Sequence, residues 1–448
     1  MRNKILLVLT ALCALVSCGR SEVFSDFAAS VSVSMTENPL RAAVDIVFEK
    51  DCSYRIMYWK ASEGFDKARQ TEIYRASAGK ARRIVKILYP ETEYRVKVEI
   101  NGVLDSNELS FTTGTIPPEV PVYNVLIDNG GPSEGYLLQW QATSPGYLTF
   151  CDMDGKVVWY EVFDQAVRHV YYDPSRKEFA VLTGFREGVN SREFQRLCDK
   201  ILVVNLDGER VIEWTASEEN VPYPHHDIKI MPDGNLIFFN AVEKDGLWGD
   251  GFTITDRTGK VLKEWDIFSE LDPATDTWLN ITDFSYDLVH GNSVNWDTDG
   301  NFYITLNRYN ELWKIDGTSG DVLWRFGEHG NLTFNGSWPL GGLHSAVPLV
   351  PDRVLVYNNG AGENPSSRAQ IYKVAGRTAT LELDVPVATE YSSRDRSNVE
   401  LLPYGKTLLF ASTLARKCVF TDLEGNPLKV ISRSGIAYRS HYFEDVSF

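Results

Sequence analysis

The sequence predicts an all-β protein in which a small β-sandwich is followed by a six-bladed β-propeller. From Tyr123 onward, two β-runs joined by a glycine-containing turn recur six times, at intervals of 49 to 61 residues. Repeats of this length with hairpin turns are typical of propeller blades, and few stretches of the chain have helical periodicity. With 448 residues, 43% of them hydrophobic, the chain can bury the cores of more than one domain.

Residues 1–18 have the features of a bacterial lipoprotein signal peptide. Arg2 and Lys4 precede an apolar stretch, residues 5–16, that is too short for a stable membrane span. The end of this stretch, Leu15-Val16-Ser17-Cys18, resembles a lipobox, in which Cys18 becomes the lipidated first residue. We therefore expect a protein of the bacterial cell envelope, periplasmic or at the cell surface, held to the membrane by its lipid anchor.

Composition excludes several other functions. Four cysteines beyond Cys18 are far apart and have no CxxC spacing, so nothing indicates a metal site, and an oxidising compartment permits disulfides without defining their pairing. These are Cys52, Cys151, Cys198 and Cys418. The formal charge of −16 argues against a nucleic-acid partner. Any anion site must then be positive locally, against an unfavourable overall field.

Residues 28–115 form the predicted sandwich, because short runs alternate apolar and polar side chains. The stretch from Leu88 to Val96 resembles the fibronectin type III signature, in which Tyr94 makes the tyrosine corner. The domain holds no cluster of acid and base residues, which favours a spacer or docking role. Pro117, Pro118 and Pro121 then predict a stiff linker.

Residues 123–448 form the predicted propeller, with one glycine in the turn of each outer hairpin. These are Gly155, Gly208, Gly259, Gly320, Gly376 and Gly425. Between them lie inner hairpins, including 226–239, 290–306, 344–357 and 399–411. The first strand of an inner hairpin lines the central channel, and propellers usually bind ligands at its mouth. His226, His290 and His344 each open such a strand, so we expect them to share one pocket.

Four short motifs hold the candidate site: Pro224-His225-His226-Asp227, His290-Gly291-Asn292-Ser293, Asn307-Arg308-Tyr309 and Gly341-Gly342-Leu343-His344. Together they resemble the bacterial aryl-sulfate sulfotransferases over essentially the whole propeller. The resemblance implies a PAPS-independent enzyme without a cofactor, which moves a sulfuryl group from an aryl sulfate to a phenol through a sulfo-histidine. It implies His344 as nucleophile, with His226, His290 and Arg308 around the sulfuryl oxygens.

The residue types suit this chemistry on their own. A neutral imidazole is a competent nucleophile near neutral pH, and a guanidinium can make a planar two-point contact with an oxyanion. Either His226 or His290 can give the departing phenolate its proton. Asn292 can orient an imidazole or donate to a sulfuryl oxygen, and Tyr309 can stack on a phenol ring. His225 is a further candidate for substrate binding, although strand neighbours face opposite ways, which favours packing.

Two other interpretations stay open at this stage. A single strand histidine is usually structural, but three at equivalent positions of a repeat together with Arg308 favour a functional site. The main alternative to the enzyme is a non-catalytic surface lipoprotein whose propeller binds a sulfated or anionic ligand or a glycan. A quinone-dependent dehydrogenase is disfavoured, because those propellers typically have eight blades with regular tryptophan repeats.

Overall fold

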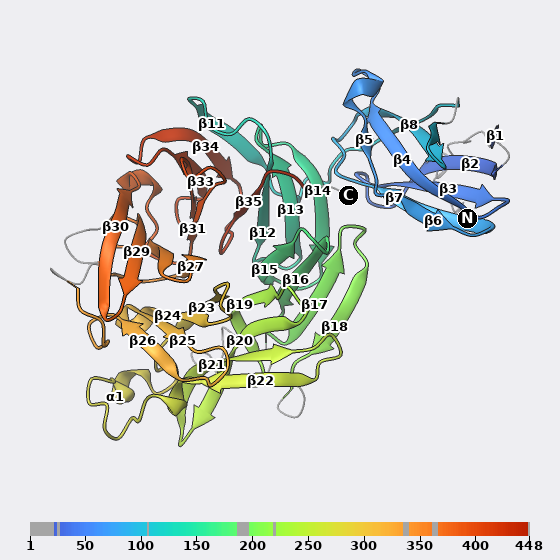
Figure 1. Cartoon of the computed structure of the whole chain (residues 1–448). Helices are drawn as coiled ribbons and strands as arrows, with labels where there is room; N and C mark the ends of the chain where they lie inside the picture. Colours follow the sequence, from blue (N-terminus) through green and yellow to red (C-terminus); the bar gives the residue numbers. More distant parts are fainter. Residues whose placement is uncertain are drawn as a thin grey trace, which may run out of the picture. The chain divides into compact units, whose positions relative to one another are not determined.

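The structure is a computed structural model that describes residues 22–24, 27–104, 107–185, 197–217, 221–334, 340–360 and 366–446. The predicted lipid site, Cys18, lies outside these residues. The chain divides into two compact units, residues 1–115 and 116–448 (Figure 1). Strands dominate both, so the predicted all-β class is confirmed. Within the described part of the chain, no helix is long and apolar enough to cross a membrane, and Cys52, Cys151, Cys198 and Cys418 are free thiols.

The first unit consists of two antiparallel sheets. One contains β1 (Glu22–Phe24), β2 (Ala28–Met35), β3 (Ala42–Phe48) and β7 (Gly79–Val85). The other contains β10 (Leu109–Thr112), β8 (Glu93–Ile100), β4 (Cys52–Lys60) and β5 (Arg69–Gln70), with β6 (Tyr74–Ala76) and β9 (Val103–Leu104) at its edges.

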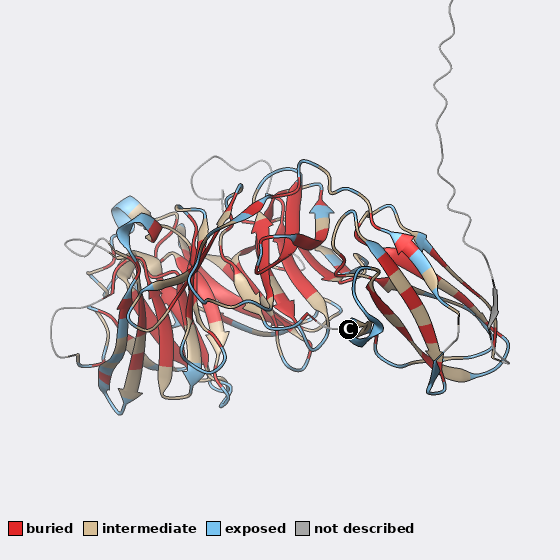
Figure 2. Cartoon of the chain, turned by 90° about the horizontal axis from the view of Figure 1, so that it is seen from above, coloured by how far each residue is buried: buried red, intermediate tan, exposed pale blue. Residues whose placement is uncertain are grey.

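Burial alternates along the strands of this unit, as in β8, so each sheet has one buried face (Figure 2). The hydroxyl of Tyr94 accepts a hydrogen bond from the backbone N–H of Tyr89 at 2.9 Å. This is the contact expected of a tyrosine corner.

In the part of the chain that the structure describes, the second unit consists of six antiparallel sheets, each built mainly from strands that follow one another in sequence. The first sheet contains β14 (Val157–Phe163), β13 (Gly146–Asp152), β12 (Tyr136–Gln141) and β35 (His441–Phe443). The second contains β15 (Val167–Asp173), β16 (Glu178–Thr183), β17 (Lys200–Asn205) and β18 (Arg210–Thr215). The third contains β19 (Pro224–Ile230), β20 (Leu236–Lys244), β21 (Leu247–Thr255) and β22 (Val261–Asp266). The fourth sheet contains β23 (Gly291–Trp296), β24 (Phe302–Leu306), β25 (Glu311–Ile315) and β26 (Val322–Phe326). The fifth contains β27 (Ser345–Val350), β28 (Arg353–Asn358), β29 (Arg368–Ala375) and β30 (Thr378–Pro386). The sixth contains β31 (Asn398–Leu401), β32 (Leu408–Ser412), β33 (Lys417–Thr421), β34 (Pro427–Arg433) and β11 (Tyr123–Asp128).

Short helical segments interrupt the strands. They are η1 (Phe65–Lys67) in the first unit, and η2 (Ile267–Ser269), α1 (Ile281–Phe284), η3 (Asn307–Tyr309) and η4 (Thr389–Tyr391) in the second.

Two sheets contain strands from distant parts of the chain. β35, near the C-terminus, pairs with β12, and β11, at the start of the unit, pairs with β34. The first and last parts of the unit are thereby tied together, which protects the strand edges as in other propellers. The sheets surround a common centre in Figure 1.

The predicted turn glycines all lie between two consecutive strands on the outer side of a sheet, and all have positive φ. Gly155, with φ of 80°, shows why only glycine fits. A Cβ there would lie 2.8 Å from the backbone oxygen of Tyr123, and L side chains rarely adopt this region. In the same turn, the carboxylate of Asp152 accepts from the backbone N–H groups of Asp154 and Lys156.

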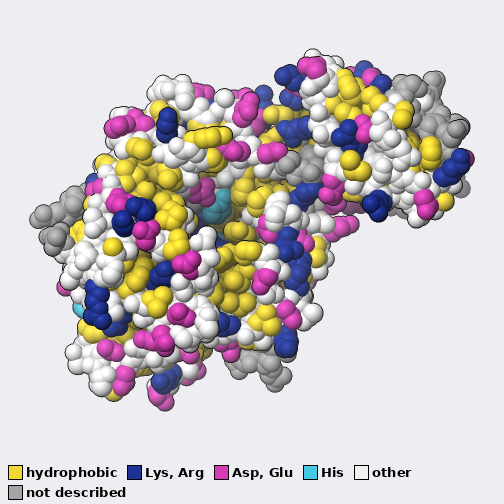
Figure 3. All heavy atoms as spheres, viewed as in Figure 1, with side chains coloured by type: hydrophobic (Ala, Val, Ile, Leu, Met, Phe, Trp, Pro, Cys, Tyr) yellow, Lys and Arg dark blue, Asp and Glu magenta, His cyan; other side chains and the backbone are white. Residues whose placement is uncertain are grey.

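The innermost strands are β15, β19, β23, β27, β31 and β35, one from each sheet. Large side chains fill the space between neighbouring sheets, for example Phe239, Phe252 and Phe302. This packing holds the inner strands in place, so their polar side chains gather around the centre. One face of the unit is hollowed near that centre, and a histidine side chain is visible in the hollow (Figure 3).

Candidate functional site

A cavity of about 720 Å³ lies where the inner strands begin. Its walls contain His226, His290 and His344 together with Tyr438. The rings of His226 and His290 are 5.2 Å apart between centroids. Tyr438 lies 6.1 Å from His226 and 6.5 Å from His344. The structure therefore brings together the three histidines that the repeat pattern placed at one mouth of the channel.

The backbone turns two of these histidines out of the regular strand. His226 and His290 both have φ of 54°, in the left-handed region that residues other than glycine rarely adopt. The strand register shifts next to each, between His225 and Ile228 and between Gly291 and Ser293. Such bulges re-aim a side chain, and strain of this kind is found where the surrounding structure enforces it.

The hydrogen bonds of His344 define which of its ring nitrogens carries the proton. Nδ1 lies 2.9 Å from the backbone oxygen of Gly342 and 2.9 Å from Oδ1 of Asn359. The amide NH2 of Asn359 donates to two backbone oxygens, those of Ser393 and Arg396, so its oxygen must face His344. Nδ1 of His344 is therefore the donor, and Nε2 carries the lone pair.

Burial, together with the nearby His290, lowers the pKa of His344 to about 4, although the bonds to Gly342 and Asn359 oppose the shift. The imidazole is thus neutral at neutral pH. Its Nε2 lies 3.8 Å from a carboxylate oxygen of Asp395, another residue of the cavity wall. A neutral, oriented imidazole with its lone pair on the cavity side has the form of a nucleophile.

Asp287 links His290 to Arg308. Its Oδ2 is 2.8 Å from Nδ1 of His290 and 2.5 Å from Nη2 of Arg308, whose Nε donates to the Asp287 backbone oxygen at 2.9 Å. The guanidinium also lies over the ring of Phe284, 3.7 Å from its centre. Arg308 is also not among the residues that line the cavity. The structure therefore does not support the predicted two-point contact between its guanidinium and the sulfuryl oxygens. Arg308 holds the carboxylate that orients His290.

His225 also lies behind the cavity. It is 3% exposed, and its Nδ1 is 2.8 Å from Nδ1 of His226. Its Nε2 is 3.1 Å from Oδ1 of Asp250, whose other oxygen accepts from the backbone N–H of Gly291. Asp250, His225 and His226 thus lie in a row behind the cavity, with the carboxylate of Asp250 near the far nitrogen of His225.

The other two predicted substrate-binding residues contact protein groups. The side chain of Asn292 is fully buried, donates to the backbone oxygen of Leu343 at 2.8 Å and accepts from Thr305 at 2.6 Å. It supports the backbone directly before His344. The hydroxyl of Tyr309 accepts from the backbone N–H of Asn280, and its ring packs against Trp278.

Sequence reasoning missed the cations of the cavity wall. Arg168, Arg396 and Arg416 line it together with one carboxylate, Asp395. They make the cavity locally positive although the chain carries −16, as an anion site requires. Arg396 precedes inner strand β31 much as His290 precedes β23, so the repeat pattern could have found it. Tyr438 had no such signal, because it precedes β35, a short strand near the C-terminus that pairs with β12 near the start of the unit.

A buried charge cluster lies beside the cavity, centred on Asp227. Its Oδ1 is 2.7 Å from Nε2 of His169 and 3.2 Å from Nη1 of Arg439, and its Oδ2 is 2.5 Å from Nζ of Lys229. Burial opposes ionisation of Asp227, but these partners hold its pKa well below the usual range. Nη2 of Arg439 donates to the backbone oxygens of Asn292 and His344, which holds the strand ends in place.

The fold and the site define a β-propeller whose channel mouth is lined by histidines and arginines. The sequence model of the arylsulfotransferase (ASST) family matches residues 126–420. The chain belongs to this family. Membership supports an aryl sulfotransferase activity in general.

The solved structures that are similar to the chain include three from bacteria. A protein of unknown function from Bacteroides caccae is 14% identical, with a TM-score of 0.45, covering 70% of this chain and 100% of its own. The periplasmic gluconolactonase PpgL from Pseudomonas aeruginosa is 11% identical, with a TM-score of 0.43 over 69% and 99%. Virginiamycin B lyase from Staphylococcus aureus is 14% identical, with a TM-score of 0.38 over 70% and 89%. No curated protein is detectably similar to the chain.

Proposed function

We propose that the protein transfers a sulfuryl group from an aryl sulfate to a phenol through a sulfo-histidine at His344, without a nucleotide donor or a cofactor. The observation that carries the proposal is the state of His344, whose Nδ1 is held as a donor while its neutral ring faces a cavity shared with two further histidines. Family membership supports the reaction class.

In the first half-reaction, the lone pair of His344 Nε2 forms a nitrogen–sulfur bond as the sulfur–oxygen bond to the phenol breaks. The phenolate leaves with the electron pair and takes a proton from His226 or His290. Positive charge develops on the His344 ring. The oxygens of Gly342 and Asn359 that accept from Nδ1 stabilise this charge, which lowers the barrier.

In the second half-reaction, the same acid–base histidine takes the proton of the acceptor phenol. The phenol oxygen bonds to sulfur, and the nitrogen–sulfur bond breaks to restore neutral His344. Of the two candidates, His226 has His225 and then Asp250 behind it, and His290 has Asp287. Both arrangements place a carboxylate where it can balance a protonated ring.

The sulfuryl oxygens carry negative charge throughout, and the cavity offers cations for it. Arg168, Arg396 and Arg416 supply a positive field in the cavity wall. Arg308 has a positioning role in this proposal, because it holds Asp287 against His290.

Incubation with 4-nitrophenyl sulfate, with and without added phenol, tests the proposal. Without acceptor, intact mass should increase by one sulfuryl group that maps to His344, and the label should disappear when phenol is added. His344→Asn should lose the label, while His329→Asn keeps it, since His329 stacks on Trp278 away from the cavity wall. Tight binding of the sulfate without turnover would instead select the non-catalytic ligand-binding protein.

We further propose that Cys18 carries lipid and tethers the protein to a membrane of the bacterial cell envelope, periplasmic or at the cell surface. The lipobox-like Leu15-Val16-Ser17-Cys18 after a short apolar stretch supports this. The first unit, with its tyrosine-corner contact, is proposed to be a fibronectin type III-like spacer.

A further inference from the structure

A second cavity, of about 450 Å³, is lined by residues from the later parts of the inner strands. Every one of the six sheets of the second unit contributes to it through its inner strand, with Tyr171 from β15, Lys229 from β19, Asn295 from β23, Val347 from β27, Glu400 from β31 and His441 from β35. None of the three catalytic histidine candidates lines it. Its volume is in the range of cavities that bind small organic molecules.

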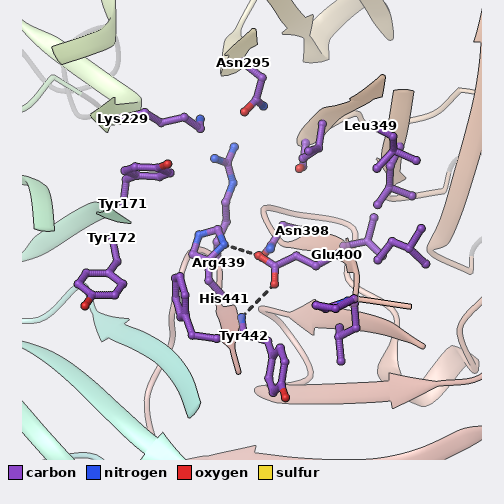
Figure 4. Close-up of a pocket in the computed structure, with 18 of the residues that line it drawn as sticks. Tyr171, Tyr172, Lys229, Asn295, Leu349, Asn398, Glu400, Arg439, His441 and Tyr442 are labelled. Carbon is purple, nitrogen blue, oxygen red and sulfur yellow. Dashed lines mark hydrogen bonds and ion pairs between the residues drawn. The ribbon is translucent and has the colours of Figure 1, made fainter. Parts of the chain in front are cut away.

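The polar end of this cavity is the charge cluster around Asp227. Figure 4 shows Lys229, Arg439 and Asn295 with their polar ends directed toward one another, and Tyr171 beside them. Lys229 donates to Asp227 and to the backbone oxygen of Val294 at 2.6 Å, which accounts for two of its three N–H groups. Asn295 donates to the backbone oxygen of Ala346, and its own oxygen is a further polar group of the wall.

The charges of this cluster do not balance. Lys229 and Arg439 are two cations beside a single carboxylate, that of Asp227. His169 adds no charge, because burial lowers its pKa to about 3. Burial also lowers the pKa of Lys229 to about 8, which leaves the amine mostly charged at neutral pH. An uncompensated buried cation is unfavourable without a counterion.

Glu400 does not supply the missing negative charge. It accepts from Nδ1 of His441 at 2.5 Å and from the backbone N–H of Tyr442 at 2.9 Å. Figure 4 shows this pair on another side of the cavity from Lys229 and Asn295. These hydrogen bonds do not neutralise Glu400, but its charge lies away from the polar end, where the two cations Lys229 and Arg439 still face the single carboxylate of Asp227.

The rest of the wall is mostly apolar. It contains Val347, Leu349, Leu355, Leu401 and Phe443. A ligand that fits the whole cavity must therefore combine one negative charge with an apolar body. An inorganic anion would leave the apolar part of the cavity unfilled, and a neutral apolar molecule would leave the cluster unbalanced.

We propose that this second cavity binds an amphipathic organic monoanion of the carboxylate type. Its head group lies against Lys229 and Tyr171, and its apolar body packs on Leu349, Leu401 and Phe443. Because the Asp227 cluster separates the two sites, this ligand and the sulfuryl substrate can be bound at the same time.

Titration calorimetry of the full chain with octanoate tests the proposal, with acetate as a probe of the head group alone and 1-octanol as a probe of the body alone. Octanoate should bind at least about tenfold more tightly than either control, since each lacks one of the two recognised parts. Lys229→Met should weaken octanoate by about tenfold or more and leave 1-octanol nearly unchanged. Leu349→Asn should weaken octanoate and leave acetate unchanged.

Two controls locate the bound probe. His344→Asn should bind octanoate like the unmodified protein, and 4-nitrophenyl sulfate should not compete with it. If Lys229→Met does not fold, Tyr171→Phe replaces it, with a smaller loss of octanoate affinity expected. The proposal is overturned if octanoate does not bind, if 1-octanol binds as tightly, or if 4-nitrophenyl sulfate displaces octanoate. None of these measurements depends on turnover, so their failure is distinct from failure of the sulfotransferase proposal.

Discussion

Acid should leave the nucleophile of this protein in its reactive form, because His344 is buried and its pKa is lowered to about 4. An ordinary histidine, with a pKa near 6.5, is only about one-tenth neutral at pH 5.5. His344 with a pKa of about 4 is almost entirely neutral there. The rate of sulfation of His344 should therefore not fall between pH 7.5 and 5.5, where an unburied histidine would lose about tenfold.

Single-turnover labelling measures this rate. The protein is mixed with excess 4-nitrophenyl sulfate without acceptor, quenched in alkali at set times and analysed by intact mass. A rate that falls about tenfold with an apparent pKa near 6.5 would refute the neutral, desolvated state of His344.

The lowered pKa of His344 also predicts that acid decreases the free energy of unfolding. The pKa of His344 is lower in the folded protein than in the unfolded chain, so the unfolded chain binds more protons between pH 6.5 and about 4. Stability is fully present above pH 6.5 and is lost as the pH falls toward about 4. The loss attributable to His344 should be about 2 kcal/mol at pH 5, and about 3 kcal/mol in total.

Urea unfolding at pH 7.5 and 5.0 measures this loss, and His344→Asn provides the matched control. The variant should lose about 2 kcal/mol less than the unmodified protein over this interval. Equal losses in both proteins would show that His344 titrates alike in the folded and unfolded states.

Four further substitutions have defined outcomes. Arg308→Lys should lower kcat by about 10- to 100-fold, because the two-point contact that holds Asp287 against His290 is lost; kcat of the unmodified protein would remove Arg308 from the site. Asn359→Leu should lower kcat by about 10- to 100-fold with a smaller change in KM, since Nδ1 of His344 loses an acceptor, and steady-state kinetics that show only a KM effect would contradict this. Arg396→Gln should raise KM for 4-nitrophenyl sulfate and reduce its salt dependence, because one cation of the cavity wall is removed; an unchanged KM at low salt would count against the positive field. Cys18→Ser should release the protein from the membrane fraction, and continued membrane association would rule out the lipid anchor.

The sequence alone determined the class of fold and the position of the histidines. Alternation of apolar and polar side chains along a strand, and glycine where a turn needs positive φ, are local requirements. They can therefore be recognised within a few residues of the sequence, as at Gly155 and Gly208. Repetition of that pattern predicted sheets around a common channel. Because His226, His290 and His344 open equivalent strands, it also predicted that they meet, and they line one cavity.

Only the tertiary structure decided how the charged groups around those histidines are paired. Arg308 contacts Asp287 instead of the cavity, and Arg439 reaches the backbone oxygen of a residue 95 positions away, that of His344. Tyr438 comes shortly before β35 in the sequence. It reaches the site because β35, near the C-terminus, pairs with β12, near the start of the unit. Such contacts depend on how the ring of sheets closes and on which buried charges find a partner. The closure of the ring and the pairing of buried charges depend on the packing of the whole unit, and neither produces a repeating pattern in the sequence.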